Sequence, residues 1–127
     1  HPDMFDCATQ LTLVANFAMR AVYPLLGQDA PELPSDDPKA AIAIAHEALS
    51  RLSPSDFIGA EDRQIRHQAG FADLDQSAQY YLQHFALPNL WFHLSMAFAI
   101  MRSNGADIGK SDFDGLHQYP VGFSWDS

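Results

Sequence analysis

Apolar residues recur every three or four positions along the first part of the chain. The repeat lies within residues 3–23 and comprises Phe5, Ala8, Leu11, Ala15, Ala18 and Val22. This spacing places the apolar side chains on one face of an amphipathic helix. We expect Asp3 to cap the start of this helix, and Pro24 and Gly27 to end it.

A second amphipathic pattern follows a loop at residues 28–37. It covers residues 39–52, and its apolar stripe consists of Ile42, Ala45, Leu49 and Leu52. The preceding Ser35–Pro38 combines capping residues with a proline, which is typical of a helix start. Residues 55–75 are irregular, except that residues 64–68 and 71–74 can pair across Ala69-Gly70. We therefore expect a short β-hairpin at about 64–74.

The last helical pattern covers residues 76–103 and ends at Asn104-Gly105. Pro88 lies inside it and cannot donate a hydrogen bond to the carbonyl of His84, which predicts a kink or a break. Residues 90–101 are apolar nearly all round, as in a helix at the centre of a bundle. Residues 106–127 are expected to form an irregular tail laid over the bundle. These elements predict an all-α helical bundle that forms one domain over residues 1–127.

The charge balance argues against nucleic acids and anionic membrane surfaces as partners. The chain has seven basic and sixteen acidic residues, for a net charge of −9, and the basic residues are scattered. A nucleic-acid-binding protein needs clustered Lys and Arg to neutralise phosphates.

The rest of the composition indicates a cytoplasmic protein. Cys7 is the only cysteine, so no internal disulfide can form, and a reducing compartment follows most simply. Residues 1–25 lack the pattern of a signal peptide. Residues 85–101 are too short and too polar for a membrane span.

One polar cluster interrupts the apolar last helix. Asn89 and His93 are four residues apart and share a helical face, and His84 precedes the expected kink. Buried polar groups need partners, and three interpretations fit this cluster. It is a structural network, a metal site, or a small-molecule or proton-transfer pocket that uses His93 or His84 as a general base.

The other histidines and the common catalytic motifs add no further site. His46, His67 and His117 show no metal-ligand spacing, and each is interpreted as a surface or structural residue. The chain has no nucleophile motif, phosphate-binding loop or Cys-x-x-Cys pair.

Several runs of the chain resemble a bacterial and fungal family known as domain of unknown function 1993. The most specific run is His84–His93, and further matches are Ala99–Gly105, Gly109–Phe113, Gly59–Arg63, Pro2–Phe5, Gln10 and Asn16–Phe17. The resemblance implies a DinB/YfiT-like four-helix bundle, expected to be a homodimer. Many such bundles resemble metal-dependent enzymes or thiol transferases. The family's first helix has no counterpart here, which predicts an apolar groove that a partner subunit could fill.

The resemblance also implies a pocket formed by Gln10, Asn89 and His93, with His84 nearby. The superfamily's metal sites resemble three histidines, two of them spaced His-x-x-x-His on the last helix. Here His93 is the only residue at such a ligand position, while Asn89 and Gln10 stand at the other two. Amide oxygens are poor zinc ligands, so a divalent metal has an incomplete ligand set.

Two hypotheses about function follow from the sequence. The first is a protein that binds a small molecule, or acts as an enzyme, through the polar pocket around His93. The alternative is a non-catalytic helical protein that acts through homodimerisation.

Overall fold

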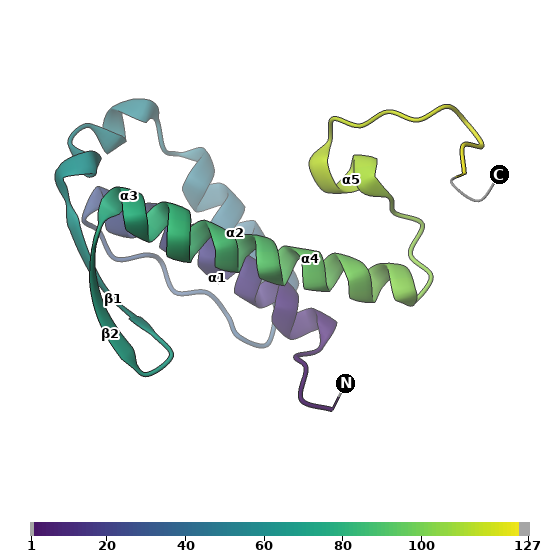
Figure 1. Ribbon diagram of the computed structural model, residues 1–127, viewed down its shortest axis with the longest axis horizontal. Coiled ribbons are helices and arrows are strands. Elements are labelled where there is room, and N and C mark those ends of the chain that lie inside the picture. The colour runs from purple at the N-terminus through teal and green to yellow at the C-terminus, as the bar shows by residue number, and fades with distance from the viewer. Residues whose placement is uncertain (1, 125–127) are drawn as a thin grey trace.

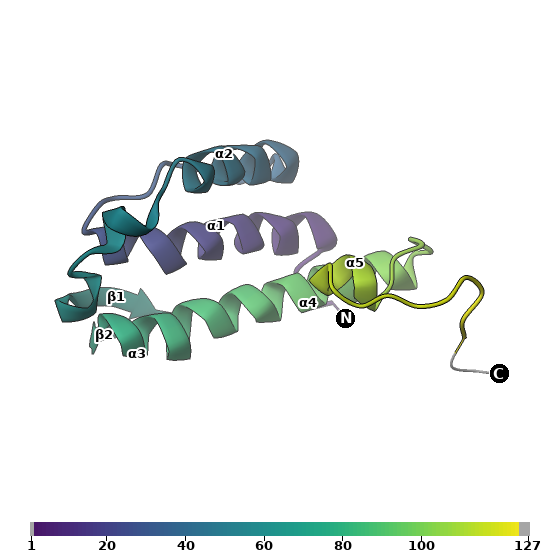
Figure 2. The same ribbon diagram turned by 90° about the horizontal axis from the view of Figure 1, so that it is seen from above.

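The computed structural model describes residues 2–124, and its main feature is a layer of long helices. Helix α1 (Cys7–Leu26) lies between α2 (Pro38–Ser50) and α4 (Leu87–Ser103), as Figures 1 and 2 show. Helix α2 runs in the same direction as α1, because the connecting loop crosses back along the layer, whereas α4 runs in the opposite direction. The helical bundle predicted from the sequence is confirmed, with one small sheet beside it.

Helix α1 is buried on two opposite faces and forms the centre of the layer. One face packs Ala21 and Leu25 against Tyr81 and Ala86. The other face contributes Ala15, Met19 and Tyr23 to a cluster with two alanines of α2, Ala41 and Ala45. This arrangement makes α1 the central element, with α2 and α4 at the edges.

The expectation that the apolar stretch 90–101 is central is therefore wrong. The buried residues of α4 are His93 and Ala97, whereas Trp91 is 51% exposed and Phe92 is 58% exposed. Because α1 packs against only one side of α4, the other large apolar residues in 90–101 are at most partly buried.

The ends of α1 differ from the prediction at both termini. Asp6, not Asp3, caps the helix, and its Oδ1 accepts a hydrogen bond of 2.8 Å from the backbone N–H of Thr9. Pro24 lies inside the last turn, and the helix ends at Gly27, whose φ of 69° suits glycine. Proline cannot donate to the carbonyl four residues earlier, and the Tyr81 hydroxyl donates to that carbonyl, of Arg20, at 2.7 Å.

Helix α2 begins as the sequence predicts and ends earlier. Asp37 accepts a hydrogen bond of 3.0 Å from the N–H of Ala40, and Pro38 occupies the first turn. The helix ends at Ser50, so Leu52 lies outside it. Ile42 is 41% exposed, whereas Ala41 and Ala45 are buried against α1 and Leu49 packs against the same cluster. The predicted stripe is thus confirmed at Ala45 and Leu49, whereas Ala41 takes the place expected for Ile42.

The predicted hairpin is present and extends further than expected. Strands β1 (Gln64–Ala69) and β2 (Ala72–Ser77) pair antiparallel, with Gln64 opposite Ser77. Ala69 pairs with Ala72, so the turn consists of Gly70 and Phe71 and not of Ala69-Gly70, and Gly70 adopts a positive φ of 59° there. Two short 3₁₀ helices, Pro54–Phe57 and Ala60–Asp62, precede the hairpin. The Arg20 side chain ties the hairpin to α1 by a hydrogen bond of 3.1 Å to the Gln68 carbonyl.

A π turn lies directly before Pro88, where the sequence predicts a kink or a break, and the helix is not broken. Helix α3 (Ala78–Tyr81), the π turn (Leu82–Ala86) and α4 follow one another without a loop. In this turn the N–H of Leu87 bonds to the carbonyl of Leu82, five residues earlier. This pairing lets the helix continue through Pro88, which has no N–H to donate.

The C-terminal segment contains one element that the sequence analysis missed. Helix α5 (Lys110–Asp114) interrupts the expected irregular tail. Phe113 contacts Trp91 and Phe98 of α4, with ring centroids 6.3 Å and 5.3 Å apart. The tail prediction also included residues 125–127, which lie outside the described residues. Within residues 2–124, no helix is long and apolar enough to cross a membrane.

Candidate functional site

The antiparallel packing of α1 and α4 brings Gln10 and His93 into contact. Gln10 lies in the first turns of α1 and is 3% exposed, and His93 lies near the middle of α4 and is 8% exposed. The Nδ1 atom of His93 is 2.8 Å from Oε1 of Gln10. Two polar side chains that are distant in sequence thus satisfy each other inside an apolar helix contact.

Aromatic rings enclose the imidazole of His93. Phe17 stacks on it with a centroid distance of 5.4 Å and an interplanar angle of 20°. Phe92 meets it edge to face at 5.2 Å. Burial lowers the pKa of His93 below its usual value of 6.5, because an imidazolium loses more hydration energy than a neutral ring. Burial therefore favours the neutral form of His93 at pH 7.

The hydrogen bond to Gln10 also decides which ring nitrogen of His93 can react. Because Oε1 is an acceptor, Nδ1 carries the ring proton and Nε2 carries a lone pair. Among the described residues, the fully buried side-chain N and O atoms without a partner are Thr12 Oγ1 and His67 Nδ1. His93 Nε2 is not one of them, and no described residue bonds to it, so this atom keeps contact with solvent.

Asn89 and His84 do not join this pair. The Nδ2 atom of Asn89 donates to the carbonyl of Phe85 at 2.8 Å, so its amide is held by the helix's own backbone. His84 is exposed on the π turn, and its ring lies against Tyr80 at 4.3 Å. Of the four candidates from the sequence, the structure brings together only Gln10 and His93.

The residues around His93 do not fit a divalent metal. A zinc site needs three or four nitrogen, sulfur or carboxylate ligands around one point. The described part of the chain contains no group of three or more His, Cys, Asp or Glu side chains with that arrangement. The partners of His93 are an amide and two phenyl rings, so the imidazole has no second ligand beside it.

Phe17 and Arg20 belong to the surroundings of the site, and the sequence analysis did not identify them. Phe17 is seven residues after Gln10, two helical turns along the same face, so the spacing alone could have predicted the ring stacked on His93. The Arg20 guanidinium lies 5.1 Å from the Phe17 centroid and 4.9 Å from that of Phe85. This contact has no sequence signal, because Phe85 approaches from the π turn.

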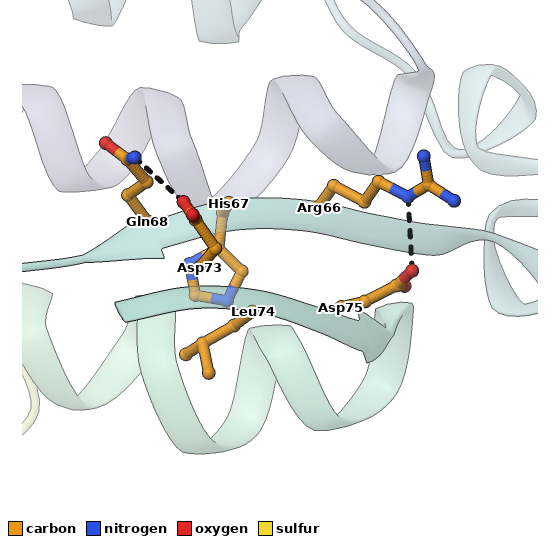
Figure 3. A pocket seen from close by; sticks show the side chains of 6 residues that line it. All are labelled: Arg66, His67, Gln68, Asp73, Leu74 and Asp75. Carbon is orange, nitrogen blue, oxygen red and sulfur yellow. Dashed lines mark hydrogen bonds and ion pairs between the residues drawn. The ribbon is translucent and has the colours of Figure 1, made fainter. Parts of the chain in front are cut away.

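A second polar region lies on the hairpin, where a hollow of about 440 Å³ is lined by Arg66, His67, Gln68, Asp73, Leu74 and Asp75 (Figure 3). Most of its polar atoms bond to each other across the strands. Arg66 Nε is 3.1 Å from Asp75 Oδ2, and Gln68 Nε2 is 2.8 Å from Asp73 Oδ1. His67 Nε2 is 2.9 Å from Gln76 Oε1. The hollow is thus a set of paired surface groups, and neither Gln10 nor His93 lines it.

Comparison with known proteins agrees with this fold. The sequence matches the family described as "Domain of unknown function (DUF1993)" over residues 1–114. A solved structure of a DinB family member protein from Shewanella denitrificans is similar, with 28% sequence identity and a TM-score of 0.81. The match covers 95% of this chain and 71% of that chain. Among curated proteins, none matches the sequence significantly. The chain thus belongs to the DUF1993 family and has the fold of a DinB family member.

Proposed function

We propose that the chain binds a small neutral molecule at His93, with Nε2 as the hydrogen-bond acceptor. The observation that carries this proposal is the fixed tautomer of a buried imidazole whose second nitrogen still meets solvent. No described residue bonds to Nε2, so its lone pair is open to a hydrogen-bond donor from outside the chain.

The surroundings of Nε2 define the class of ligand. Phe17 and Phe92 provide apolar ring surface, so the ligand has an apolar, preferably flat body. The lone pair requires an O–H or N–H donor on that body. Charged ligands fit poorly, because the same burial that lowers the pKa of His93 disfavours a charge beside it. If the bound molecule loses its proton to Nε2, the site acts as a general base, which is the enzymatic form of the proposal.

The test compares phenol with anisole, which has the same ring and no hydroxyl donor. Binding is followed by chemical-shift changes in the ¹⁵N-labelled chain. Phenol is expected to shift the signals of the His93 imidazole and of Phe17, and anisole to bind more weakly. The His93→Phe variant is expected to keep its fold and to lose phenol binding, because the acceptor is gone.

The matched control is His84→Phe, the same substitution at an exposed histidine on the adjoining π turn. This variant should bind phenol like the original chain. Equal binding of phenol and anisole, or equal loss in both variants, contradicts the proposal. A His93→Phe chain that merely unfolds supports a structural role for the Gln10–His93 pair instead.

A second candidate function, homodimerisation through α4, is favoured by a different observation. Trp91 and Phe92 are adjacent on α4 and are both more than half exposed, at 51% and 58%. Two large exposed rings on one helix are costly to leave in water, and a two-fold axis would cover both copies at once. Sedimentation velocity at micromolar concentration tests this directly. A monomer at that concentration rules the candidate out, and a dimer supports it.

A further inference from the structure

A hollow of about 570 Å³ lies where the C-terminal end of α4 meets α5 and the segment that follows it. Its wall includes the side chains of Arg102, Lys110, Ser111 and His117. Arg102 lies in the last turn of α4, and Lys110 is the first residue of α5. The hollow includes neither Gln10 nor His93, so it is independent of the site proposed above.

This hollow concentrates positive charge on a strongly acidic chain. The chain has seven basic residues and a net charge of −9, yet two of the seven basic side chains line this one hollow. Neither Arg102 nor Lys110 forms a side-chain hydrogen bond or an ion pair with any residue between 2 and 124. Both cations are therefore available to a ligand.

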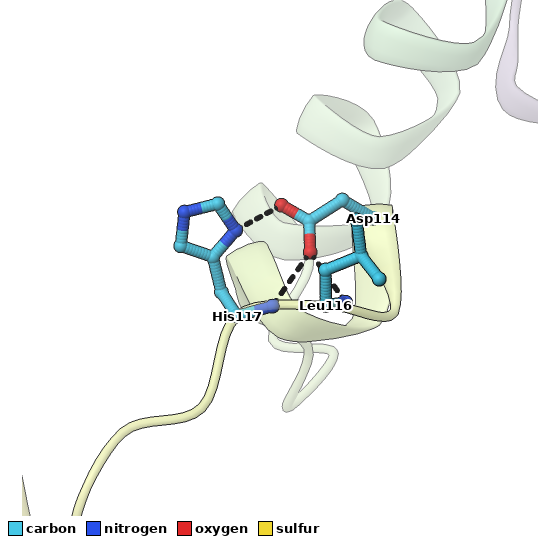
Figure 4. A network of polar contacts seen from close by, with 3 residues as sticks. All are labelled: Asp114, Leu116 and His117. Carbon is cyan, nitrogen blue, oxygen red and sulfur yellow. Dashed lines mark hydrogen bonds and ion pairs between the residues drawn. The ribbon is translucent and has the colours of Figure 1, made fainter.

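The carboxylates of Asp112 and Asp114, beside the hollow, accept hydrogen bonds from backbone N–H groups of their own segment. Asp112 Oδ2 accepts a hydrogen bond of 2.7 Å from the N–H of Gly109. Asp114 Oδ1 accepts from the N–H groups of Leu116 and His117, at 2.8 Å and 2.9 Å (Figure 4). These bonds hold the turn after α5 and lower the pKa of Asp114, so its carboxylate is occupied locally.

The same carboxylate orients the imidazole of His117. Asp114 Oδ2 pairs with Nδ1 of His117, which leaves Nε2 on the side of the ring away from Asp114 (Figure 4). The His117 ring stacks on Tyr119 with an interplanar angle of 18°, and Tyr119 stacks on Phe123 with an angle of 11°. Tyr119 and Phe123 also line the hollow, which thus combines two cations with a row of nearly parallel rings.

We propose that this hollow binds a small phosphate monoester that carries a flat ring. A phosphate dianion matches two cations, and a guanidinium offers it a two-pronged set of donors. The ring of the ester has the stacked side chains as a surface. A nucleic-acid polymer is a poorer fit, because the remaining basic residues do not extend the positive charge beyond the hollow.

Stabilisation of the fold does not account for both cations. Arg102 in the last turn of α4 gains from the negative end of the helix dipole. Lys110 stands in the first turn of α5, where the dipole gives a cation nothing, and it has no acidic partner among the described residues. An anionic ligand in the hollow would give Lys110 the partner that the fold does not supply.

The probe for the test is phenyl phosphate, with inorganic phosphate and benzoate in parallel, each titrated into the ¹⁵N-labelled chain at constant ionic strength. Phenyl phosphate is expected to bind more tightly than inorganic phosphate because of its ring, and more tightly than the singly charged benzoate. Lys110→Gln and Arg102→Gln are each expected to weaken phenyl phosphate binding by about tenfold, the effect of losing one charged contact. Both side chains are exposed, so the variants should keep their melting temperature.

The matched control is Lys39→Gln, which removes an exposed lysine from the first turn of α2. The control should leave the affinity for phenyl phosphate unchanged. An equal loss in Lys39→Gln and Lys110→Gln would show general attraction to the surface and would overturn the proposal. So would unsaturable binding, or binding of benzoate as tight as that of phenyl phosphate.

Discussion

At the scale of single residues, a few long-range contacts bond polar atoms that have no partner within their own helix. Pro24 cannot donate to the Arg20 carbonyl, and the Tyr81 hydroxyl donates to it from a residue 61 positions away. Tyr81 is 1% exposed, and burial raises the pKa of its hydroxyl, so it remains a donor at neutral pH. One tyrosine thus allows a proline within the last turn of α1.

Removal of this hydroxyl by Tyr81→Phe should destabilise the fold by about 1–2 kcal/mol, because the partly buried Arg20 carbonyl then loses its partner. Urea unfolding measures the change. The control is Tyr80→Phe, at a neighbouring tyrosine that is 52% exposed. We expect its effect to be within about 0.5 kcal/mol. Equal effects at both positions would mean that the Tyr81 hydroxyl does not support α1.

His93 should make the stability of the protein depend on pH. Its folded-state pKa lies below the unfolded value of 6.5, so the unfolded chain takes up a proton first as the pH falls. Stability should therefore decrease below about pH 6.5, until the folded-state imidazole is also protonated, and should not change through His93 above about pH 7.5. Urea unfolding at both ends of this range measures the effect.

The variants His93→Gln and His46→Gln separate this effect from that of the other histidines. His93→Gln should lose less stability on acidification than the original chain, because it has no proton to gain at this position. His46 is exposed on α2, so His46→Gln should show the full decrease. The same decrease in all three chains would place the acid sensitivity elsewhere.

The sequence predicted part of this site for a clear physical reason. Asn89 and His93 share a helical face, so their inward direction followed from the period of the helix. The partner Gln10 came from the family resemblance, because residues 83 positions apart leave no local signal of contact. His84 was placed incorrectly with them, because the π turn rotates the residues before Leu87 relative to α4.

At the scale of elements, the number of neighbours of a helix decides which of its apolar residues are buried. The sequence located α1, α2, the hairpin and the last helix, since each carries a distinct period or a turn signal. It did not show which helix is central. Helix α4 is apolar nearly all round and still lies at the edge, whereas α1, between two neighbours, is buried on both sides.

The contact between α1 and α2 depends on small residues, which gives a test of this packing. Ala45 is 4% exposed in a cluster with Ala15 and Met19, so Ala45→Leu should destabilise the fold by about 1–3 kcal/mol through overpacking. Ala43 lies on the exposed face of the same helix. The matched change Ala43→Leu should alter stability by less than about 0.5 kcal/mol in the same urea unfolding experiment. Similar losses in both variants would contradict the packing of α2 through its alanine line.

At the scale of the whole molecule, the three-helix layer is thin and leaves large apolar side chains in contact with water. They lie on different elements: Phe5 before α1, Ile42 on α2, Phe71 in the hairpin turn, and Trp91 and Phe92 on α4. Two such side chains are adjacent on α4, and Met4 and Phe5 are adjacent before α1. If homodimerisation covers one of these surfaces, we expect it to be that of α4, where Trp91 and Phe92 are both more than half exposed on a regular helix.

The replacement Phe92→Glu should therefore shift the chain from dimer to monomer in sedimentation velocity at micromolar concentration. A carboxylate at that position would have to lose its hydration in the interface, which is unfavourable without a partner charge. The control Phe71→Glu adds the same charge at the fully exposed hairpin turn, so it matches the change in net charge and should remain a dimer. Because Phe92 also touches His93, circular dichroism must show that the helical content of Phe92→Glu is retained. If both variants dissociate equally, repulsion between acidic chains and not the α4 surface controls association. If both remain dimers, another of the exposed apolar surfaces forms the interface.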